Sequence, residues 1–321
     1  FMWYLLENYG TDEEVTGLVD HREMYFVPVV NPDGYAYNQE TDPTGGGMWR
    51  KNRRKNPDSI SVGVDLNRNY GYQWGFDNVG SSPKGSDETY RGTSGFSEPE
   101  LQAIRNFCIA KKFSVALNYH TYGNLLIYPW GYSDSNTRDS VFFWSMASDL
   151  TASNLYTYGT GSQTVGYVTN GDSDDWMYGD TLAKPKVFSM TPEVGTFTDG
   201  FWPAQARILP LAQENLRANL YLAHFAGQFI AIKSAESKPR RIGDTVRINL
   251  TFQNKGVTSS PIASSVEMKS TSPTLEIIDV HRDSLSTANT QPVIFRVMTK
   301  SANPGTLMSI QAYIRYPEGI T

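Results

Sequence analysis

Three apolar, strand-like segments of this chain each lead into polar side chains that could act in catalysis. In chain order these are Asn67 and Arg68 after residues 62–66, His120 after residues 115–117, and Glu193 after residues 187–190. In open α/β sheets, ligands bind outside the carboxyl ends of the strands. Buried apolar runs that end in arginine, histidine and glutamate therefore predict one active site, which could bind an anion and move protons.

The segments between these residues predict the elements that would position them. Ser97 and Glu100 form a capping box with Pro99 in the first turn, and this predicts a helix to about Lys111. We expect strands at residues 24–30, 62–66, 113–118 and 186–190, and helices at residues 139–156 and 203–228, the second kinked or begun at Pro210. Together they indicate an α/β fold with a mixed, mostly parallel sheet flanked by helices.

Turn-forming residues mark the loops of this fold. Residues 31–34 (Asn-Pro-Asp-Gly) predict a turn, and residues 69–93 and 159–175 predict long loops rich in glycine and polar residues. Long loops in compact domains are often functional.

The C-terminal part of the chain has a different pattern. Residues 229–321 alternate apolar and polar side chains in short runs, separated by turn signals at residues 254–256, 259–261 and 303–305. This pattern is typical of a small all-β sandwich. We therefore predict two domains, residues 1–228 and residues 229–321.

Composition excludes some classes of function. The chain has 321 residues and a formal net charge of −5, which argues against a nucleic-acid partner. A basic cluster at residues 49–55 is interpreted as a solvated loop, with an anion site as the alternative. No apolar run is long enough to span a membrane. Cys108 is the single cysteine, so no disulfide can form within the chain, and it is expected to be buried on a helix.

Six motifs in a fixed order resemble the zinc metallocarboxypeptidase family, and most closely its bacterial carboxypeptidase T-like branch. They are NPDGY, MWRKNRR, GVDLNRNY, ETYRGTSGFSEPE, NYHTYGNLLIYPWGY and TPEVG, which start at residues 31, 48, 63, 88, 118 and 191. They fall within residues 1–228. Each motif alone is weak, but six in the same order make chance similarity very improbable.

The resemblance implies a role for each matched residue. His120 would be a zinc ligand, Glu193 the general base, and Arg50 the group that stabilises the oxyanion. The substrate's terminal carboxylate would be held by Asn67 and Arg68, because arginine binds carboxylates bidentately. Tyr167 would close over the substrate, and Tyr122 would line the substrate groove. Considered alone, His120 would more often be a core histidine and Glu193 a salt-bridged carboxylate.

The chain departs from the family at the metal site. The family's first two zinc ligands come from a His-x-x-Glu motif, and none of His21, His120, His224 and His281 has a glutamate three residues later. We therefore expect the carboxypeptidase-like domain to be N-terminally incomplete here, with two of the three zinc ligands outside this chain. A single histidine would bind zinc weakly.

Acidic residues predict the substrate preference. In the resembled family the position of Asp174 lies at the base of the pocket for the substrate's last side chain, and Asp172 matches another acidic position of the bacterial branch. A carboxylate there is expected to favour C-terminal Lys or Arg. The alternative is that Asp172 and Asp174 merely cap turns in a Gly-Asp loop.

These observations predict a zinc-dependent carboxypeptidase that acts on the C-termini of peptides or proteins. Two alternatives stay open. One is a non-catalytic peptide-binding form that keeps the carboxylate clamp, which consists of Asn67, Arg68 and Tyr167, without metal. The other is a related zinc hydrolase of cell-wall peptides. The family resemblance also implies a secreted or extracytoplasmic location.

Overall fold

The computed structural model describes residues 1–237, 245–258, 265–270, 272, 275–280, 293–299, 310–316 and 319–320. It divides into two compact units. Unit 1 combines residues 1–24 with residues 223–321, and unit 2 comprises residues 25–222. The predicted domain boundary between residues 228 and 229 stays a prediction. The compact units have other bounds, because residues 1–24 pack with the C-terminal part of the chain.

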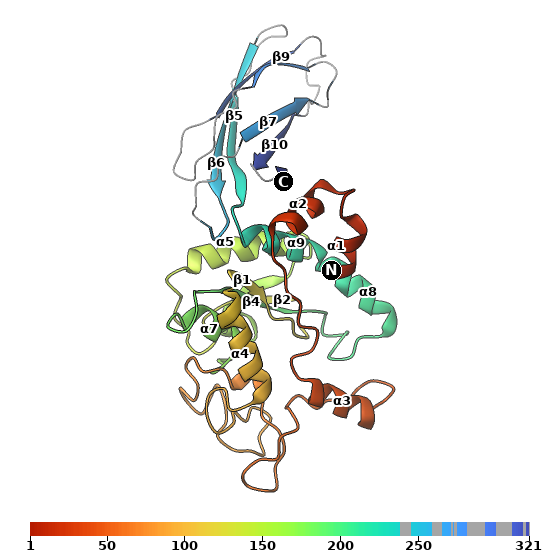
Figure 1. Ribbon diagram of the computed structural model, residues 1–321, viewed down its shortest axis with the longest axis vertical. Coiled ribbons are helices and arrows are strands. Elements are labelled where there is room, and N and C mark those ends of the chain that lie inside the picture. Colours follow the sequence, from red (N-terminus) through yellow and green to blue (C-terminus); the bar gives the residue numbers. More distant parts are fainter. Residues whose placement is uncertain are drawn as a thin grey trace. The chain divides into compact units, whose positions relative to one another are not determined.

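Unit 2 is built on a four-stranded sheet with the order β1-β4-β2-β3 (Figure 1). The strands are β1 (Val115–Leu117), β2 (Leu125–Ile127), β3 (Thr157–Gly159) and β4 (Phe188–Glu193). β1 pairs with β4 in parallel, β2 with β3 in parallel, and β2 with β4 antiparallel. The sheet is therefore mixed and mostly parallel, as predicted.

Helices surround this sheet. They are α3 (Pro32–Thr41), the 3-10 helix η1 (Leu66–Arg68), α4 (Pro99–Lys111), α5 (Ser140–Thr151), α6 (Gly161–Thr164), α7 (Ser173–Gly179) and α8 (Gln205–Glu214), followed by α9 (Leu216–Phe225), which continues into unit 1. The predicted helices at residues 139–156 and after residue 97 are confirmed. The segment predicted as a helix over residues 203–228 is helical from Gln205 to Phe225, but it is interrupted at Asn215 between α8 and α9, and Pro210 lies inside α8.

Three local expectations are wrong for identifiable reasons. Residues 31–34 begin a helix, because the Asn31 side chain accepts a hydrogen bond from the Gly34 amide and Pro32 occupies the first turn. The Ser97 hydroxyl donates to the Glu98 carboxylate, so the predicted capping box does not form. Residues 62–66 form no strand; they contribute one isolated bridge at Val62 and the start of η1.

Residues 24–30 also form no strand in the described structure. Phe26, Val27, Val29 and Val30 are each at least 38% exposed. The sheet of unit 2 incorporates only β1 to β4 among the described residues, and an apolar run becomes a strand only where a neighbouring strand supplies its hydrogen-bond ladder. A continuous apolar run without period-2 alternation was therefore a poor guide here.

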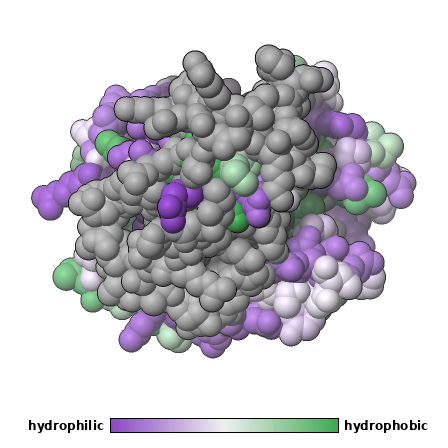
Figure 2. Space-filling model, turned by 90° about the horizontal axis from the view of Figure 1, so that it is seen from above, coloured by the Kyte–Doolittle hydropathy of each residue, from purple (hydrophilic) through white to green (hydrophobic). Residues whose placement is uncertain are grey.

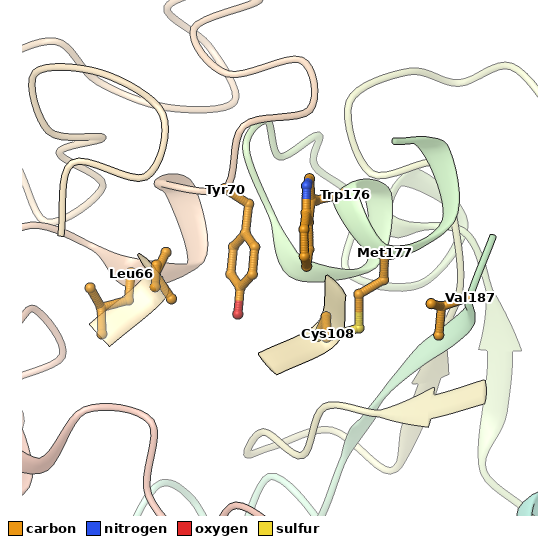
Figure 3. Packing of buried hydrophobic residues seen from close by; sticks show 7 residues of the cluster. Leu66, Tyr70, Cys108, Trp176, Met177 and Val187 are labelled. Atoms are coloured by element: carbon orange, nitrogen blue, oxygen red, sulfur yellow. The ribbon is translucent and has the colours of Figure 1, made fainter. Parts of the chain in front are cut away.

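A buried cluster ties η1 to helices α4 and α7 on one side of the sheet. Its members are Leu66, Tyr70, Leu101, Cys108, Trp176, Met177 and Val187. Figure 3 shows the rings of Tyr70 and Trp176 side by side within this cluster, and their centroids lie 5.7 Å apart. Cys108 is buried on α4, as predicted. This packing fixes η1, which carries Asn67 and Arg68, against α7, which follows Asp172.

The described residues of unit 1 form α1 (Met2–Asn8), α2 (Glu13–His21) and seven strands in two antiparallel sheets. These strands are β5 (Ile230–Ser237), β6 (Thr245–Asn254), β7 (Ser265–Ser270), β8 (Leu275–Val280), β9 (Val293–Thr299), β10 (Ile310–Tyr316) and β11 (Gly319–Ile320). The sheet orders are β5-β6-β9-β8 and β11-β10-β7, which confirms the all-β prediction. The turns predicted at residues 259–261 and 303–305 lie outside the described residues, as does His281.

Within unit 1, residues 1–24 contact the segment that begins at residue 223 through specific hydrogen bonds. The Arg22 guanidinium donates to the Ala223 carbonyl at 3.1 Å, and His224 Nε2 lies 2.9 Å from Glu14 Oε1. His224 is buried. In the view of Figure 2, the coloured residues mix hydrophilic and hydrophobic types and do not form one apolar patch.

Candidate active site

One pocket of unit 2, with an empty volume of about 590 Å³, brings together most of the predicted site residues. Eight of them line it: Arg50, Asn67, Arg68, His120, Tyr167, Asp172, Asp174 and Glu193. Tyr122 does not line this pocket; its ring lies 4.9 Å from that of Phe201.

The strand ends place His120 beside Glu193. The two residues form a parallel bridge just beyond β1, with the His120 amide donating to the Pro192 carbonyl and the Val194 amide donating to the His120 carbonyl, both at 2.9 Å. Burial lowers the pKa of His120 to about 4, with further lowering by Arg50 and Arg68 against an opposing effect of Asp65. The imidazole is therefore neutral near pH 7, which is the form that binds metal ions.

Glu193 carries a carboxylate that is poorly satisfied. Its Oε2 atom is buried and has no hydrogen-bond partner in the described part of the chain. Burial raises the pKa of Glu193 to about 7, and the Arg50 charge opposes this rise. A carboxyl group that is half protonated near neutral pH can both accept and return a proton.

Asn67 and Arg68 are positioned by the tight turn of η1. The Asp65 carboxylate accepts a hydrogen bond from the Asn67 amide at 3.0 Å, and the Asn67 side-chain oxygen accepts from the Ser173 amide at 3.0 Å. This second bond orients the Asn67 side chain by linking η1 to the first residue of α7. Asp65 has no place in the sequence prediction, although its carboxylate is what shapes this turn.

Arg68 is the buried cation of the pocket. Arg68 is only 6% exposed. Its Nη1 donates a hydrogen bond to the Asn67 carbonyl at 2.8 Å, and its Nε has no hydrogen-bond partner in the described structure. A buried guanidinium with unused donors is costly unless a ligand or water accepts from it. A carboxylate matches that requirement in charge and in shape.

The acidic residues of the pocket serve two structural purposes. Asp172 is the N-cap of α7, because its Oδ1 accepts from the Asp175 amide at 2.9 Å, and its Oδ2 accepts from the Thr169 hydroxyl at 2.6 Å. The turn-capping alternative therefore holds for Asp172, which lines the pocket as well. Asp174 lies inside α7 and accepts hydrogen bonds from side chains of the sheet.

Three side chains that hold Asp174 were missed by the sequence prediction. Asn118 Nδ2 and Ser189 Oγ donate to Oδ1 at 2.8 and 2.5 Å, and Thr191 Oγ1 donates to Oδ2 at 2.7 Å. A signal for them existed, since side chains alternate along a strand. Asn118 shares a face with His120, and Ser189 and Thr191 share a face with Glu193.

Tyr167 and Arg50 are the accessible members of the pocket. Tyr167 is 54% exposed in the loop after α6, and Arg50 is exposed in the basic cluster at residues 49–55. The expectation that this cluster is a solvated loop is wrong for Lys51, which is 3% exposed and donates to the Gly85 and Asp87 carbonyls. Arg53 packs over the rings of Tyr37 and Trp49.

The residues present do not make a complete zinc site. Over the parts of the chain described above, no three His, Cys, Asp or Glu side chains come together in a way that could hold a metal ion. A catalytic zinc site has three protein ligands, and His120 offers one imidazole.

Among the described residues, no helix is long and apolar enough to cross a membrane.

Unit 2 thus combines a mixed sheet flanked by helices with a histidine–glutamate pair beside its parallel strands β1 and β4 and a buried arginine on η1. A family model described as zinc carboxypeptidase matches residues 1–218. The chain belongs to the zinc carboxypeptidase family, which is zinc-dependent.

Two curated carboxypeptidases are similar to this chain. Mast cell carboxypeptidase A of Rattus norvegicus is 31% identical over 236 residues, which cover 70% of this chain and 54% of that protein. Metallocarboxypeptidase A of Arthroderma otae is 33% identical over 226 residues, covering 67% of this chain and 51% of that protein. The chain thus spans about half the length of the curated relatives it matches.

Among solved structures, the crystal structure of thrombin activatable fibrinolysis inhibitor superposes with a TM-score of 0.62 at 32% identity. The match covers 70% of this chain and 57% of that chain. Bovine thrombin-activatable fibrinolysis inhibitor in complex with tick carboxypeptidase inhibitor gives a TM-score of 0.59, also at 32% identity, over 69% of this chain and 74% of that chain.

Proposed function

We propose that this chain is the substrate-binding and proton-transferring part of a zinc-dependent metallocarboxypeptidase that removes C-terminal residues from peptides. The observation that carries this proposal is the buried Arg68 with an unused Nε in a pocket that also contains Asn67, Glu193 and Arg50. An exopeptidase must recognise a terminal carboxylate, and a fixed, desolvated guanidinium does so strongly.

Each side chain has a separate task in this proposal. Arg68 and Asn67 bind the terminal carboxylate, and the exposed Tyr167 covers the bound residue. Glu193 accepts a proton from the attacking water and returns it to the leaving amine. Arg50 stabilises the negative charge that develops on the carbonyl oxygen. His120 would be one zinc ligand, and the two others implied by the family resemblance are not residues of this chain.

The substrate preference that we propose is C-terminal Lys or Arg. Asp174 and Asp172 line the same pocket as Arg68, and a buried carboxylate is the complement of a cationic side chain. The bacterial branch and an extracytoplasmic location, both suggested by the sequence motifs, are part of the same proposal.

A second function is favoured by the metal site. Asn67, Arg68 and Tyr167 line one pocket, while the described residues contain no group of three His, Cys, Asp or Glu side chains that could hold a metal ion. In this second proposal the chain by itself binds peptide C-termini without cleaving them. The two functions share the clamp and differ in zinc and in turnover.

The clamp is tested by titrating the 321-residue chain with the peptide Ala-Ala-Arg and with its C-terminal amide, using calorimetry. We expect the free acid to bind and the amide to bind at least tenfold more weakly. Arg68→Met should weaken binding of the acid by about 2–5 kcal/mol, because it removes one partner of a buried charge pair. Arg138→Met is the matched control, since Arg138 is exposed and lies outside the pocket.

Equal binding of the acid and the amide, or full binding by Arg68→Met, would exclude the clamp. Zinc content and peptide hydrolysis are measured in the same samples. Zinc binding with turnover supports the catalytic function. Peptide binding without zinc or turnover supports the peptide-binding module for this chain.

A further inference from the structure

Asp174 occupies an unusual position for a residue that is expected to meet a cationic substrate. It is 7% exposed, and hydrogen bonds from Asn118, Ser189 and Thr191 already reach both of its carboxylate oxygens. The group is thus stabilised by neutral donors and has no cation among its hydrogen-bond partners. Its charge state is therefore set by burial, by these hydrogen bonds and by the nearby charge of Asp172.

The local hydrogen bonds tolerate a proton on one oxygen only. Asn118 Nδ2 donates both to Asp174 Oδ1 and to Ser189 Oγ, the latter at 2.9 Å, so the Ser189 hydroxyl directs its own proton at Oδ1. Oδ1 must then remain an acceptor. Oδ2 faces the Thr191 hydroxyl, which can rotate and become the acceptor of a carboxylic acid proton. Both protonation states keep their hydrogen bonds.

The charge of Asp172 disfavours the ionised form of Asp174. The titratable and charged groups that share this region are Asp172 and Asp175 from the α7 turn, Arg68 from η1, Tyr70 after η1, Glu193 at the end of β4 and His120 after β1. Asp175 is fully buried and accepts from the amides of Gly131 and Tyr132. Three buried carboxyl groups thus stand near one buried guanidinium.

We propose that the protonation state of Asp174 selects the substrate's last side chain: the ionised form binds Lys or Arg, and the protonated form admits an aliphatic side chain. This inference rests on the proposed function, since it takes the pocket to hold a C-terminal residue beside Arg68. Arg68 is more than nine-tenths buried, lines the pocket and has an unused Nε, which independently indicates an anionic ligand end.

Burial, together with the charge of Asp172, raises the pKa of Asp174 to about 7, although the hydrogen bonds from Ser189, Thr191 and Asn118 oppose this rise. Below pH 7, binding of a cationic side chain must release one proton from Asp174 to solvent. Affinity for such a peptide therefore falls by about tenfold per pH unit below the pKa and levels off above it. An aliphatic side chain shows the opposite sign, because the neutral carboxyl is its better neighbour.

The experiment measures dissociation constants of Ala-Ala-Arg and Ala-Ala-Leu between pH 5.5 and 8.5. The protein is the 321-residue chain carrying Glu193→Gln, which removes a second pocket carboxyl whose pKa burial raises to about 7. We expect the preference for Arg over Leu to rise at least about tenfold between pH 5.5 and pH 7.5. Calorimetry in two buffers of different ionisation enthalpy should show proton release with the Arg peptide only.

Asp174→Asn in the same background is the matched control. Its amide imitates the protonated acid, with the nitrogen facing Thr191. The preference for Ala-Ala-Arg over Ala-Ala-Leu should therefore stay low and should not change with pH. Circular dichroism confirms that both variants are folded. A preference for Arg that does not change with pH, or a pH dependence that survives Asp174→Asn, would overturn this inference and leave the proposed pocket intact. Failure of both peptides to bind at every pH would instead refute the proposed function.

Discussion

Gly171 is the residue at which a single added methyl group should disturb the carboxylate clamp most directly. Its φ of +71° lies in the left-handed region, and a Cβ there would meet the Arg68 carbonyl oxygen at 2.6 Å and the Tyr70 carbonyl oxygen at 3.1 Å. The Tyr70 amide also donates to the Gly171 carbonyl at 2.9 Å. These contacts are with backbone atoms, which cannot rotate away as a side chain could.

Gly171→Ala should therefore lower the free energy of unfolding by two additive effects. The left-handed conformation costs a non-glycine residue about 1–2 kcal/mol. The close contact with backbone adds about 1–3 kcal/mol, as in other overpacked sites. We expect a total loss of about 2–5 kcal/mol and weaker binding of Ala-Ala-Arg, because any relaxation of the chain moves Arg68.

Gly200→Ala is the matched control. Gly200 has a φ of +59°, but nothing lies within 4 Å of its added Cβ, so only the conformational cost of about 1–2 kcal/mol should appear. Urea unfolding followed by tryptophan fluorescence measures both variants, and Trp3 is the one tryptophan of the sequence outside unit 2. Equal losses for the two variants, with unchanged peptide binding by Gly171→Ala, would refute this reasoning.

Two further predictions concern the support of the pocket. Trp176→Ala should lower the free energy of unfolding by about 3–5 kcal/mol, because Trp176 is fully buried and its Nε1 donates to Asp180 at 3.1 Å; a loss below about 1 kcal/mol in urea unfolding would contradict this. The hydrogen bonds from Arg207 and Thr196 hold the pKa of Asp199 well below its usual 3.8, so its contribution is present above pH 3.8 and is lost as the pH falls through the lowered pKa. Asp199→Asn should accordingly have a lower melting temperature at pH 7, and the difference from the parent should narrow on acidification below pH 3.8; a difference independent of pH would argue against the pairing with Arg207.

Sequence patterns predicted the pocket better than they predicted the elements around it. The structure brings His120 and Glu193 together because β1 and β4 are adjacent parallel strands, His120 follows β1, and Glu193 is the last residue of β4. Asn67 and Arg68 reach the same pocket through a different element, since the Asp65 carboxylate folds their segment into a 3-10 turn. A short apolar run cannot by itself distinguish a strand from such a turn.

The partners of Asp174 could not be derived from their own residue types. Ser189 and Thr191 are small polar residues on a strand, and such residues are often exposed or satisfied locally. Their role depends on α7 packing onto β4, which is a tertiary contact between segments with no pairing signal in the sequence. The period-2 relation to Glu193 places them on one face, but only the fold supplies the carboxylate that they hold.

The two-part composition of unit 1 has a consequence for biosynthesis. Residues 1–24 are synthesised before unit 2, whereas the segment that they pack against begins at residue 223. Unit 2 can fold as soon as residues 25–222 have been made. In contrast, α1 and α2 can pack only after the residues from 223 onward have been synthesised. Throughout that interval the apolar side chains of these two helices are available to chaperones, and their burial depends on synthesis of the residues that follow unit 2.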